Sequence, residues 1–331
     1  MSLTAIVPVW NNAELLRRLL ASLDAQTLRV DAVVAVDNGS TDGAPEIARQ
    51  AGARVISMGR NAGFAAAVNQ GIREAGAGLL AVLNTDVELA PEYLALLSRS
   101  IRESDAWFGT GKILDATSQS RIDATFDVLS RGGTAYRVGN GQHDGDTFSR
   151  GRAIWSAPWT AAMFRSEVFD KVGLLDESLE SYLEDVDFGL RCARAGLAGR
   201  YVPEAVAWHR GSASLGAWHP DTVRRIARNQ LYLLARHFSS ESLHRYAWAI
   251  WCAQTLWGCL AVRHGTGMAW LRGKWQGFRG WRKIRGTDPF PDRQLHQLMV
   301  ENERLIREFQ ADENGDWYWK IYFRFAGTEA K

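Results

Sequence analysis

The chain has 331 residues, which is enough for one large α/β domain and an appended unit. Hydrophobic residues make up 46% of it and charged residues 23%, a globular composition that excludes wholesale disorder. Its formal net charge of +2 excludes no class of partner, because the charges are unevenly placed along the chain.

Short apolar runs alternate with helical patterns through the N-terminal third. Leu3–Val9 is typical of a buried strand, and Asn11 or Asn12 can cap the helix that follows it. Apolar strands that alternate with helices indicate parallel strands covered on both faces, so the pattern predicts an α/β fold with a mostly parallel central sheet. Further strands are expected at residues 32–36, 54–58 and 79–83, and helices near residues 44–51 and 65–75.

The pattern loosens after Glu103. Residues 130–152 are rich in Gly, Ser and Asp, and this composition predicts a loop between two halves of one domain. Trp155–Arg165 restores the strand-like order, and a helix is expected from about Ser166. Residues 222–238 are then typical of a helix.

The C-terminal third has an unusual charge pattern. We expect a catalytic domain over residues 1–215 and a helical extension over 216–331. Residues 242–287 contain eight Arg and Lys but no Asp or Glu. Within them, the uncharged run Tyr246–Val262 is short for a spanning helix, and Trp mixes with basic residues as far as residue 286. Residues 246–286 are therefore predicted to associate with an anionic membrane surface. A helix packed on the catalytic domain is the alternative, and no motif supports a nucleic-acid partner.

Three positions at strand ends carry side chains suited to binding a nucleotide or a metal. Asp37 and Asp86 each follow an apolar run, where a carboxylate can contact a base or ribose or can ligate a metal. His209 also follows a strand-like run and can complete a metal site of oxygen and nitrogen ligands. A turn, a helix cap or a structural histidine is the alternative reading. Neither the dinucleotide glycine motif nor the P-loop motif occurs, which disfavours dehydrogenases and P-loop enzymes.

Three carboxylates, Glu184, Asp185 and Asp187, lie within four residues. Carboxylates held close together repel one another, and enzymes use such proximity to obtain a general base. The alternative is the first turn of a helix, where the helix dipole favours acidic residues.

Eight short motifs, in this order, resemble those of family 2 glycosyltransferases with the GT-A fold, especially the bacterial rhamnosyltransferase-like branch. The resemblance covers roughly residues 3–215. The motifs are Ile6-Val-Pro-Val-Trp-Asn11, Val36-Asp-Asn-Gly-Ser-Thr-Asp42, Arg60-Asn-Ala-Gly-Phe64, Asn69-Gln-Gly-Ile72, Leu83-Asn-Thr-Asp86, Val172-Gly-Leu-Leu-Asp-Glu177, Tyr182-Leu-Glu-Asp-Val-Asp187 and His209-Arg-Gly-Ser-Ala-Ser214.

The resemblance implies an inverting, metal-dependent transfer of a sugar from a nucleoside diphosphate donor. Asp185 would be the catalytic base, which Glu184 and Asp187 would tune or orient. Asp86 and His209 would bind Mn²⁺ or Mg²⁺, and Glu88 is a further candidate because Asn84 replaces the first acidic residue of the D-x-D pattern. The nucleotide-sugar site would include Pro8, Val9, Asn11, Asp37, Asn38, Arg60, Asn61, Asn69, Asn84 and Asp86.

The expected partners follow from the same resemblance. dTDP-rhamnose is the first expectation for the donor, and a UDP-hexose or UDP-N-acetylhexosamine is the next. The acceptor would be a glycan or a polyprenyl-diphosphate-linked glycan in bacterial cell-surface polysaccharide synthesis. The N-terminus lacks a leader pattern, and the three cysteines show no disulfide or metal spacing. We therefore expect a cytoplasmic protein that is peripheral on the inner face of the cell membrane.

Three other functions remain to be weighed. A sugar nucleotidyltransferase would carry a Gly- and Arg-rich first loop ending in Lys, whereas Pro8-Val-Trp-Asn-Asn12 stands there. A processive synthase would carry Q-x-x-R-W, but Gln276–Trp281 has one residue too many. A degenerate, membrane-associated scaffold would not transfer sugar, and an assay of transfer distinguishes it.

Overall fold

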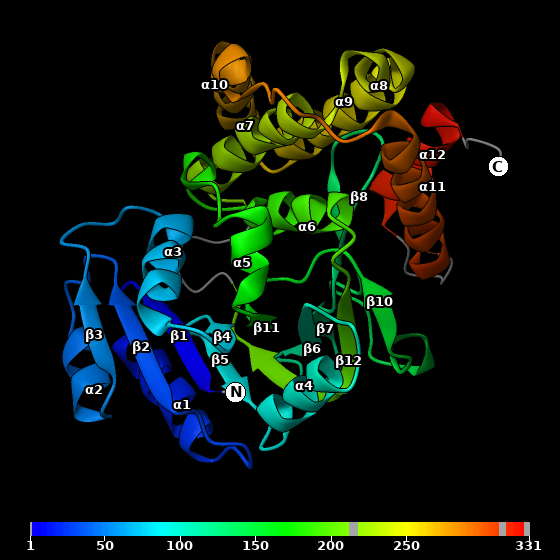
Figure 1. Ribbon diagram of the computed structural model, residues 1–331. Helices are drawn as coiled ribbons and strands as arrows, with labels where there is room; N and C mark the ends of the chain where they lie inside the picture. Colours follow the sequence, from blue (N-terminus) through cyan, green and yellow to red (C-terminus); the bar gives the residue numbers. More distant parts are fainter. Residues whose placement is uncertain (1, 212–217, 311–315, 328–331) are drawn as a thin grey trace. The chain divides into compact units, whose positions relative to one another are not determined.

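The computed structural model contains two compact units (Figure 1). Residues 1–126 and 139–213 form the first, here called the sheet unit, and residues 127–138 and 214–331 form the second, the helical unit. The division lies close to the expected boundary at residue 215, but residues 127–138 group with the helical unit because they form a hairpin that contacts one of its helices. The structure describes all residues except 1, 212–217, 311–315 and 328–331.

The sheet unit is built on one ten-stranded, mixed sheet. Its strands are β1 (Leu3–Val9), β2 (Ala32–Asp37), β3 (Arg54–Ser57), β4 (Leu79–Leu83), β5 (Val87–Leu89), β6 (Phe108–Asp115), β7 (Ile122–Ala124), β10 (Arg152–Ile154), β11 (Ala161–Arg165) and β12 (Gly199–His209). The neighbours β3, β2, β1 and β4 are parallel, as the apolar runs predicted. β11 lies antiparallel between β4 and β6, and β12 is parallel to β6. The central sheet is thus mostly parallel.

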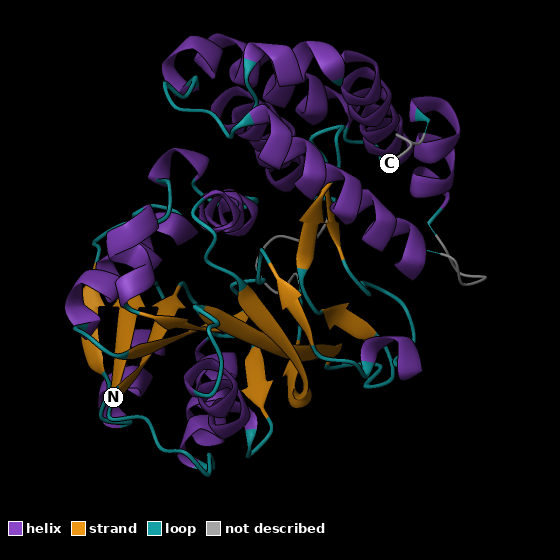
Figure 2. Ribbon diagram, turned by 45° about the vertical axis from the view of Figure 1, so that its right-hand side comes forward, coloured by secondary structure: helices purple, strands orange, loops and turns teal. Residues whose placement is uncertain are grey.

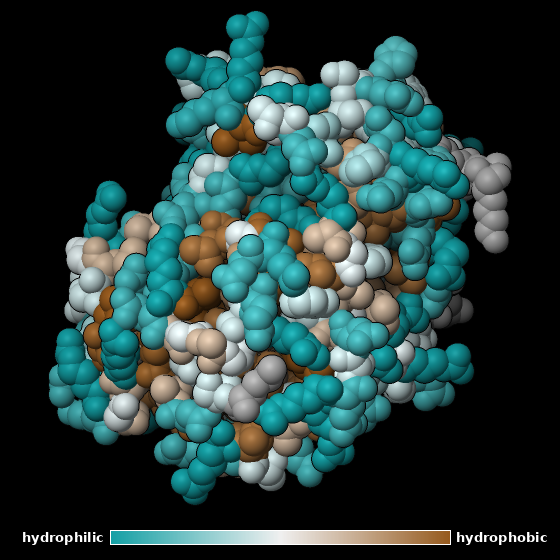
Figure 3. All heavy atoms as spheres, in the orientation of Figure 1, coloured by the Kyte–Doolittle hydropathy of each residue, from teal (hydrophilic) through white to brown (hydrophobic). Residues whose placement is uncertain are grey.

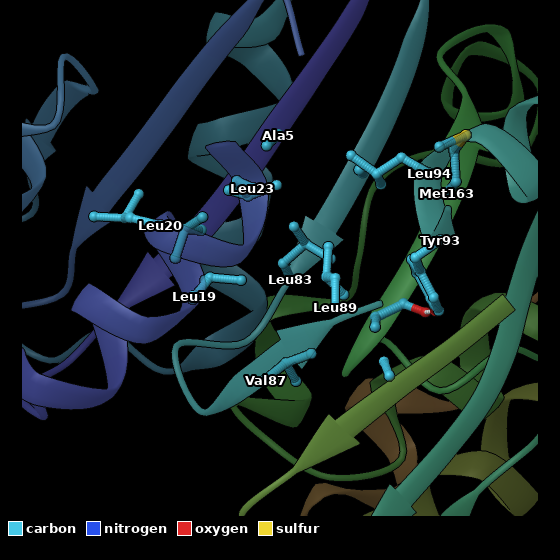
Figure 4. Packing of buried hydrophobic residues seen from close by; sticks show 14 of the residues in the cluster. Ala5, Leu19, Leu20, Leu23, Leu83, Val87, Leu89, Tyr93, Leu94 and Met163 are labelled. Carbon is cyan, nitrogen blue, oxygen red and sulfur yellow. Dashed lines mark hydrogen bonds between the residues drawn. The ribbon is translucent and has the colours of Figure 1, made fainter. Parts of the chain in front are cut away.

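Helices cover both faces of this sheet (Figure 2). They are α1 (Ala13–Asp24), α2 (Ala44–Gln50), α3 (Phe64–Ala75), α4 (Tyr93–Arg102), α5 (Glu167–Val172) and α6 (Glu184–Arg194), with 3₁₀ turns η1 (Asp146–Phe148) and η2 (Glu177–Leu179). In α1, leucines spaced three or four residues apart share one face, and Leu19, Leu20 and Leu23 pack toward Ala5 and Leu83 of the sheet (Figure 4). Burying each such side chain contributes about 1.5–3 kcal/mol.

The helical unit contains six helices and one two-stranded hairpin among the residues that the structure describes. They are β8 (Asp127–Leu129), β9 (Ala135–Arg137), α7 (Pro220–His237), α8 (Ser240–Arg245), α9 (Ala247–Arg263), α10 (Gly267–Ile284), α11 (Asp292–Phe309) and α12 (Trp317–Ala326). In the described ranges, no helix has both the length and the apolar character needed to cross a membrane.

The loop predicted at residues 130–152 is only partly a loop. β8 and β9 pair across the turn Ser130–Thr134, and η1 and the start of β10 follow. The glycine content led to the prediction of a long loop. Gly133 instead has φ +72°, the left-handed conformation that this tight hairpin turn requires. The glycine-rich composition therefore reflects turn geometry between short strands.

Candidate active site

The loops after β1 and β2 meet at the carboxyl ends of these parallel strands, where Val9 pairs with Asp37. The Asn11 side chain accepts a hydrogen bond from Thr41 N at 2.8 Å, and Asn11 N donates to Ser40 Oγ. The helix cap expected from Asn11 or Asn12 comes instead from Asp42, which accepts from Ala13 N at 3.0 Å. The two loops are therefore fixed by their own polar side chains.

Asp37 and Asn38 fold the β2 loop around the segment after β3. Asp37 is buried and its carboxylate accepts from Ser40 N at 2.8 Å. Asn38 accepts from Ala62 N at 2.8 Å and donates to Asn61 Oδ1 at 3.2 Å. Arg60 is exposed on the segment that this network holds. Four residues expected at the nucleotide are thus brought together.

The close approach of these loops depends on Gly39, whose φ is +81°. A Cβ at this position would lie 2.7 Å from the backbone carbon of Arg60, which is closer than a side chain allows. Glycine at this point therefore lets the β2 loop contact the Arg60 backbone.

The other residues expected around the nucleotide are less accessible. Pro8 is half-buried in β1, and Val9 is buried. Asn69 is 1% exposed, and its amide both accepts from Leu175 N and donates to Leu175 O, each at 2.9 Å. Asn69 therefore holds the segment before η2 against α3.

Asp86, His209 and Asp123 form a row of ionisable side chains in the sheet unit. His209 ends β12, and its Nε2 lies 3.2 Å from Asp86 Oδ1. Its Nδ1 donates to Asp123 Oδ2 at 2.9 Å, which fixes the ring orientation. The backbone also joins the row, because Arg210 N donates to Asp86 O at 3.0 Å. Asp86 and His209 are far apart in the sequence and lie in contact, as expected for one site.

The electrostatics of this row follow from burial between two carboxylates. Burial alone lowers the pKa of His209, but the hydrogen bonds and charges of Asp123 and Asp86 together outweigh it and raise this pKa to about 9. The two carboxylates therefore favour the protonated ring, and a cation that bound there would have to displace its proton.

Asp123 is the residue that sequence reasoning missed. It lies in the three-residue strand β7, and no motif surrounds it. Only the pairing of β7 with β6, which itself pairs with β12, brings Asp123 to His209. This contact arises from tertiary structure and leaves no local signal in the sequence.

Glu88 does not join the row. In the β5–β12 pairing it lies opposite Trp208, one residue before His209, and successive strand residues point to opposite faces. Its carboxylate lies 3.7 Å from Arg18 on α1. The candidate role of Glu88 as a metal ligand is therefore opposed by strand geometry.

The chemistry of the remaining donors suits a hard or borderline divalent cation. Asn84 Oδ1 is buried and has no hydrogen-bond partner, and it lies two residues before Asp86. A carboxylate, an imidazole and an amide oxygen are ligand types that Mn²⁺ and Mg²⁺ sites use. Within the described ranges, no group of three or more His, Cys, Asp or Glu side chains is arranged to hold a metal ion.

The three carboxylates of the acidic motif occupy the first turn of α6 and differ in their contacts. Asp187 is buried and forms an ion pair with the half-buried Arg191, whose NH2 lies 2.9 Å from Asp187 Oδ2. Asp185 Oδ1 accepts from Val186 N at 2.8 Å, and Asp185 O accepts from Ser156 Oγ. Glu184 is buried beside them. Asp187 therefore anchors the helix, whereas the Asp185 carboxylate is held at its N-terminal end.

The chain enters α6 through a strained segment. Glu180, Tyr182 and Leu183 all have left-handed φ values, of 61°, 71° and 68°. Non-glycine residues adopt this conformation at a cost of about 1–3 kcal/mol each, and such strain clusters at functional sites. Glu180 O accepts from Ala65 N at 3.0 Å, so the segment rests on the start of α3. Tertiary contacts thus impose the conformation that presents Asp185.

Comparison with known proteins agrees with this geometry. The family model "Glycosyl transferase family 2" matches residues 4–173. The chain belongs to this family. It is also 30% identical over 290 residues to the N-acetylglucosaminyl-diphospho-decaprenol L-rhamnosyltransferase of Mycobacterium tuberculosis, with 75% of this chain and 87% of that relative covered. The resemblance to family 2 glycosyltransferases and their rhamnosyltransferase-like branch is confirmed.

Solved structures establish the GT-A fold of this glycosyltransferase. GalNAc-T7, solved with UDP, GalNAc and Mn²⁺, superposes with a TM-score of 0.60 at 13% identity, covering 86% of this chain and 56% of that chain. The mannosyltransferase PcManGT from Pyrobaculum calidifontis, in complex with GDP-Man and Mn²⁺, superposes with a TM-score of 0.53 at 14% identity, covering 98% and 85%. These likenesses concern the fold.

Proposed function

We propose that this glycosyltransferase moves L-rhamnose, with inversion, from dTDP-rhamnose to a polyprenyl-diphosphate-linked N-acetylglucosamine at a membrane surface. The observation that carries the proposal is the contact between Asp86 and His209, which unites two family motifs at the carboxyl ends of the strands. The donor sugar and the acceptor are taken from the name of the M. tuberculosis relative, which this chain matches over 87% of its length.

The donor nucleotide would bind at the loops after β1 and β2. Asp37 is proposed to contact the base or ribose, and Arg60 to contact the nucleotide from the exposed side. Support comes from the hydrogen bonds of Asn11, Asn38 and Asn61, which preorganise these loops without a ligand. Preorganised polar loops lose little entropy on binding.

Asp185 is proposed to be the catalytic base. Its carboxylate would take the proton from an acceptor hydroxyl as that oxygen forms its bond to the anomeric carbon. The bond between this carbon and the diphosphate breaks at the same time, its electrons go to the nucleoside diphosphate, and the configuration inverts. The strained entry to α6 and the Asp187–Arg191 pair support this role, because they hold Asp185 in one orientation.

Asp86 and His209 are proposed to hold Mn²⁺ or Mg²⁺, with the orphaned oxygen of Asn84 as a further donor. A bound cation would stabilise the negative charge that develops on the leaving diphosphate. Asp123 would keep the imidazole in the tautomer that offers Nε2. The contact between Asp86 and His209 is expected to open when the cation enters.

A transfer assay tests the proposal. Purified protein is incubated with dTDP-rhamnose, UDP-glucose or UDP-N-acetylglucosamine, together with a polyprenyl-diphosphate-linked N-acetylglucosamine and Mn²⁺. The expected result is transfer from dTDP-rhamnose alone, loss of transfer in excess chelator, and an inverted anomeric configuration by NMR. Transfer from another donor replaces the rhamnose assignment, and full activity in chelator contradicts the metal role.

A further inference from the structure

One helix of the helical unit, α10, has two faces of opposite character. Its inner face is made of small residues that pack along α7. A Cβ on Gly273 would lie 2.3 Å from Arg224 O, and one on Gly277 would lie 2.8 Å from the Leu231 side chain. Lys274 is buried on the same side and donates to Ala227 O at 3.0 Å. These contacts already fix α10 on the unit.

The outer face of α10 carries large apolar side chains that packing does not use. Met268, Leu271, Trp275 and Phe278 are between 51% and 66% exposed. Their spacing of three, four and three residues places them along one line of the helix, here called the α10 stripe. Figure 3 shows apolar atoms among hydrophilic ones at the surface where α7 and α10 lie. Exposing such a stripe to water is unfavourable, and a contiguous one marks an interaction surface.

A basic line runs beside the α10 stripe. Arg272, Arg279 and Lys283 are exposed at spacings of seven and four residues, so they share the neighbouring line of the helix. Arg279 stacks over the Trp275 ring at 4.6 Å and joins the two lines. No Asp or Glu occurs between residues 242 and 287 to neutralise this charge.

The next helix along the chain, α11, shows that not every helix of the unit exposes such side chains. Its apolar side chains, among them Leu295, Met299 and Ile306, are buried. None of the exposed large apolar side chains of the described residues lies on α11. An ordinary amphipathic helix in this unit therefore turns its apolar face inward, whereas α10 presents one outward.

We infer that α10 lies in the plane of an anionic phospholipid bilayer, with the α10 stripe inserted among the lipids and the basic line against the phosphates. This deepens the membrane part of the proposed function by naming the surface that makes contact. The occupant follows from charge complementarity: apolar side chains with an adjacent row of cations match acyl chains bounded by anionic headgroups. Trp275 suits the boundary between the two.

Vesicle flotation tests the inference with the full chain and without donor or acceptor. Wild-type protein should float with vesicles of phosphatidylglycerol and phosphatidylcholine and stay at the bottom with phosphatidylcholine alone. Arg272→Glu with Arg279→Glu should weaken binding roughly tenfold or more, because each basic residue near an anionic surface contributes about 1 kcal/mol. Trp275→Ser with Phe278→Ser should weaken it comparably through the lost apolar insertion.

Matched variants on other helices of the same unit control for charge and folding. Arg304→Glu reverses an exposed charge on α11, and Phe325→Ser removes a large apolar side chain that is 59% exposed on α12. Both should float like the wild type. Circular dichroism and melting temperature should show that all variants remain folded.

Three outcomes would overturn the inference: wild type that stays at the bottom, α10 variants that float like wild type, or controls that lose as much binding as the α10 variants. A dimer in analytical ultracentrifugation that the α10 variants abolish, with no flotation, would assign the stripe to a second copy of the chain. Protein that floats but transfers no sugar would refute the proposed function and leave this inference standing.

Discussion

The two units differ in where their large apolar side chains lie. Among the described residues, nine such side chains are exposed, and all nine belong to the helical unit. The sheet unit buries its own between the sheet and the covering helices. Large apolar side chains are thus exposed to solvent in the helical unit, which is the unit for which we propose membrane contact.

The interiors of the two units can also be compared, by the kinds of side chain that each unit buries. The sheet unit has a core of aliphatic residues between α1, α4 and the strands. The helical unit combines buried apolar side chains with buried polar contacts: Arg131 pairs with Glu303 at 2.9 Å, Tyr322 donates to Glu303 at 2.7 Å, and Lys274 is enclosed with Gln230 and Gln254. Buried polar networks whose members are all paired help to specify one packing arrangement, and these contacts have that role in the helical unit.

The first prediction separates chemistry from membrane contact. Asp185→Asn should reduce transfer by about 10²–10⁴-fold, because the amide cannot accept the acceptor proton. Calorimetry should show donor binding near that of wild type, and flotation should not change. Retention of more than about a tenth of the wild-type rate, with chemistry rate-limiting, would show that Asp185 is not the base.

The second prediction concerns the interior of the helical unit. Glu303→Ala leaves the buried guanidinium of Arg131 without its carboxylate, which should lower the free energy of unfolding by about 3–5 kcal/mol. Urea unfolding followed by circular dichroism measures the loss. Glu301→Ala, an exposed change on the same helix, should be nearly neutral. Equal effects of the two variants would mean that the buried pair does not hold this unit together.

The third prediction tests whether Asp86 and His209 act on one cation. Each Ala variant should weaken Mn²⁺-dependent donor binding, and the double variant should lose less than the sum of the two, with a coupling of about 0.5–3 kcal/mol. Titration of dTDP-rhamnose at several Mn²⁺ concentrations gives the donor affinity of the wild type, the two single variants and the double variant. Glu88→Ala is the control and should change little, because this carboxylate contacts Arg18. Strictly additive losses would contradict a shared ion.

The fourth prediction is a pH effect confined to the helical unit. Burial lowers the pKa of Lys274 to about 7. In the unfolded chain this amine titrates near its ordinary pKa of about 10.4, so between these values the unfolded state binds more protons and folding becomes more favourable as pH rises. The free energy of unfolding should therefore rise between pH 7 and about 9.5, below ordinary tyrosine titration. Lys274→Met should flatten the rise, and a parallel slope in both proteins would contradict this assignment.

The sequence predicted the regular part of the sheet unit closely because local patterns determine it. β1 and β4 have the expected bounds, and α3 differs from its predicted range by one residue, since apolar strands and amphipathic helices have distinct periods. β7 and β9 escaped prediction because they are three residues long and depend on their partners. The antiparallel insertion of β11 likewise depends on long-range pairing.

The candidate site was predictable only where a motif marked it. Asp86 and His209 were expected together and lie in contact, whereas Asp123 comes from a strand with no motif. Glu88 stays a predicted ligand, and the strand pairing that places it opposite Trp208 is not visible in the sequence. The basic composition near α10 was evident from the sequence. Which side of α10 packs on the unit through its glycines, and which side carries the α10 stripe, can be seen only in the structure.

The proposed division of roles, with catalysis in the sheet unit and membrane contact in the helical unit, is tested most directly by the ratio of two transfer rates. One acceptor is embedded in anionic vesicles, and the other is a short-chain, water-soluble analogue with the same sugar and diphosphate. For Arg272→Glu with Arg279→Glu, the ratio of the vesicle rate to the soluble rate should fall roughly tenfold or more relative to wild type, since each lost cation weakens surface binding by about 1 kcal/mol. The control Arg304→Glu should keep the wild-type ratio. A ratio that stays the same in the α10 variant would contradict the account, because it would show that this surface does not bring the enzyme to its acceptor.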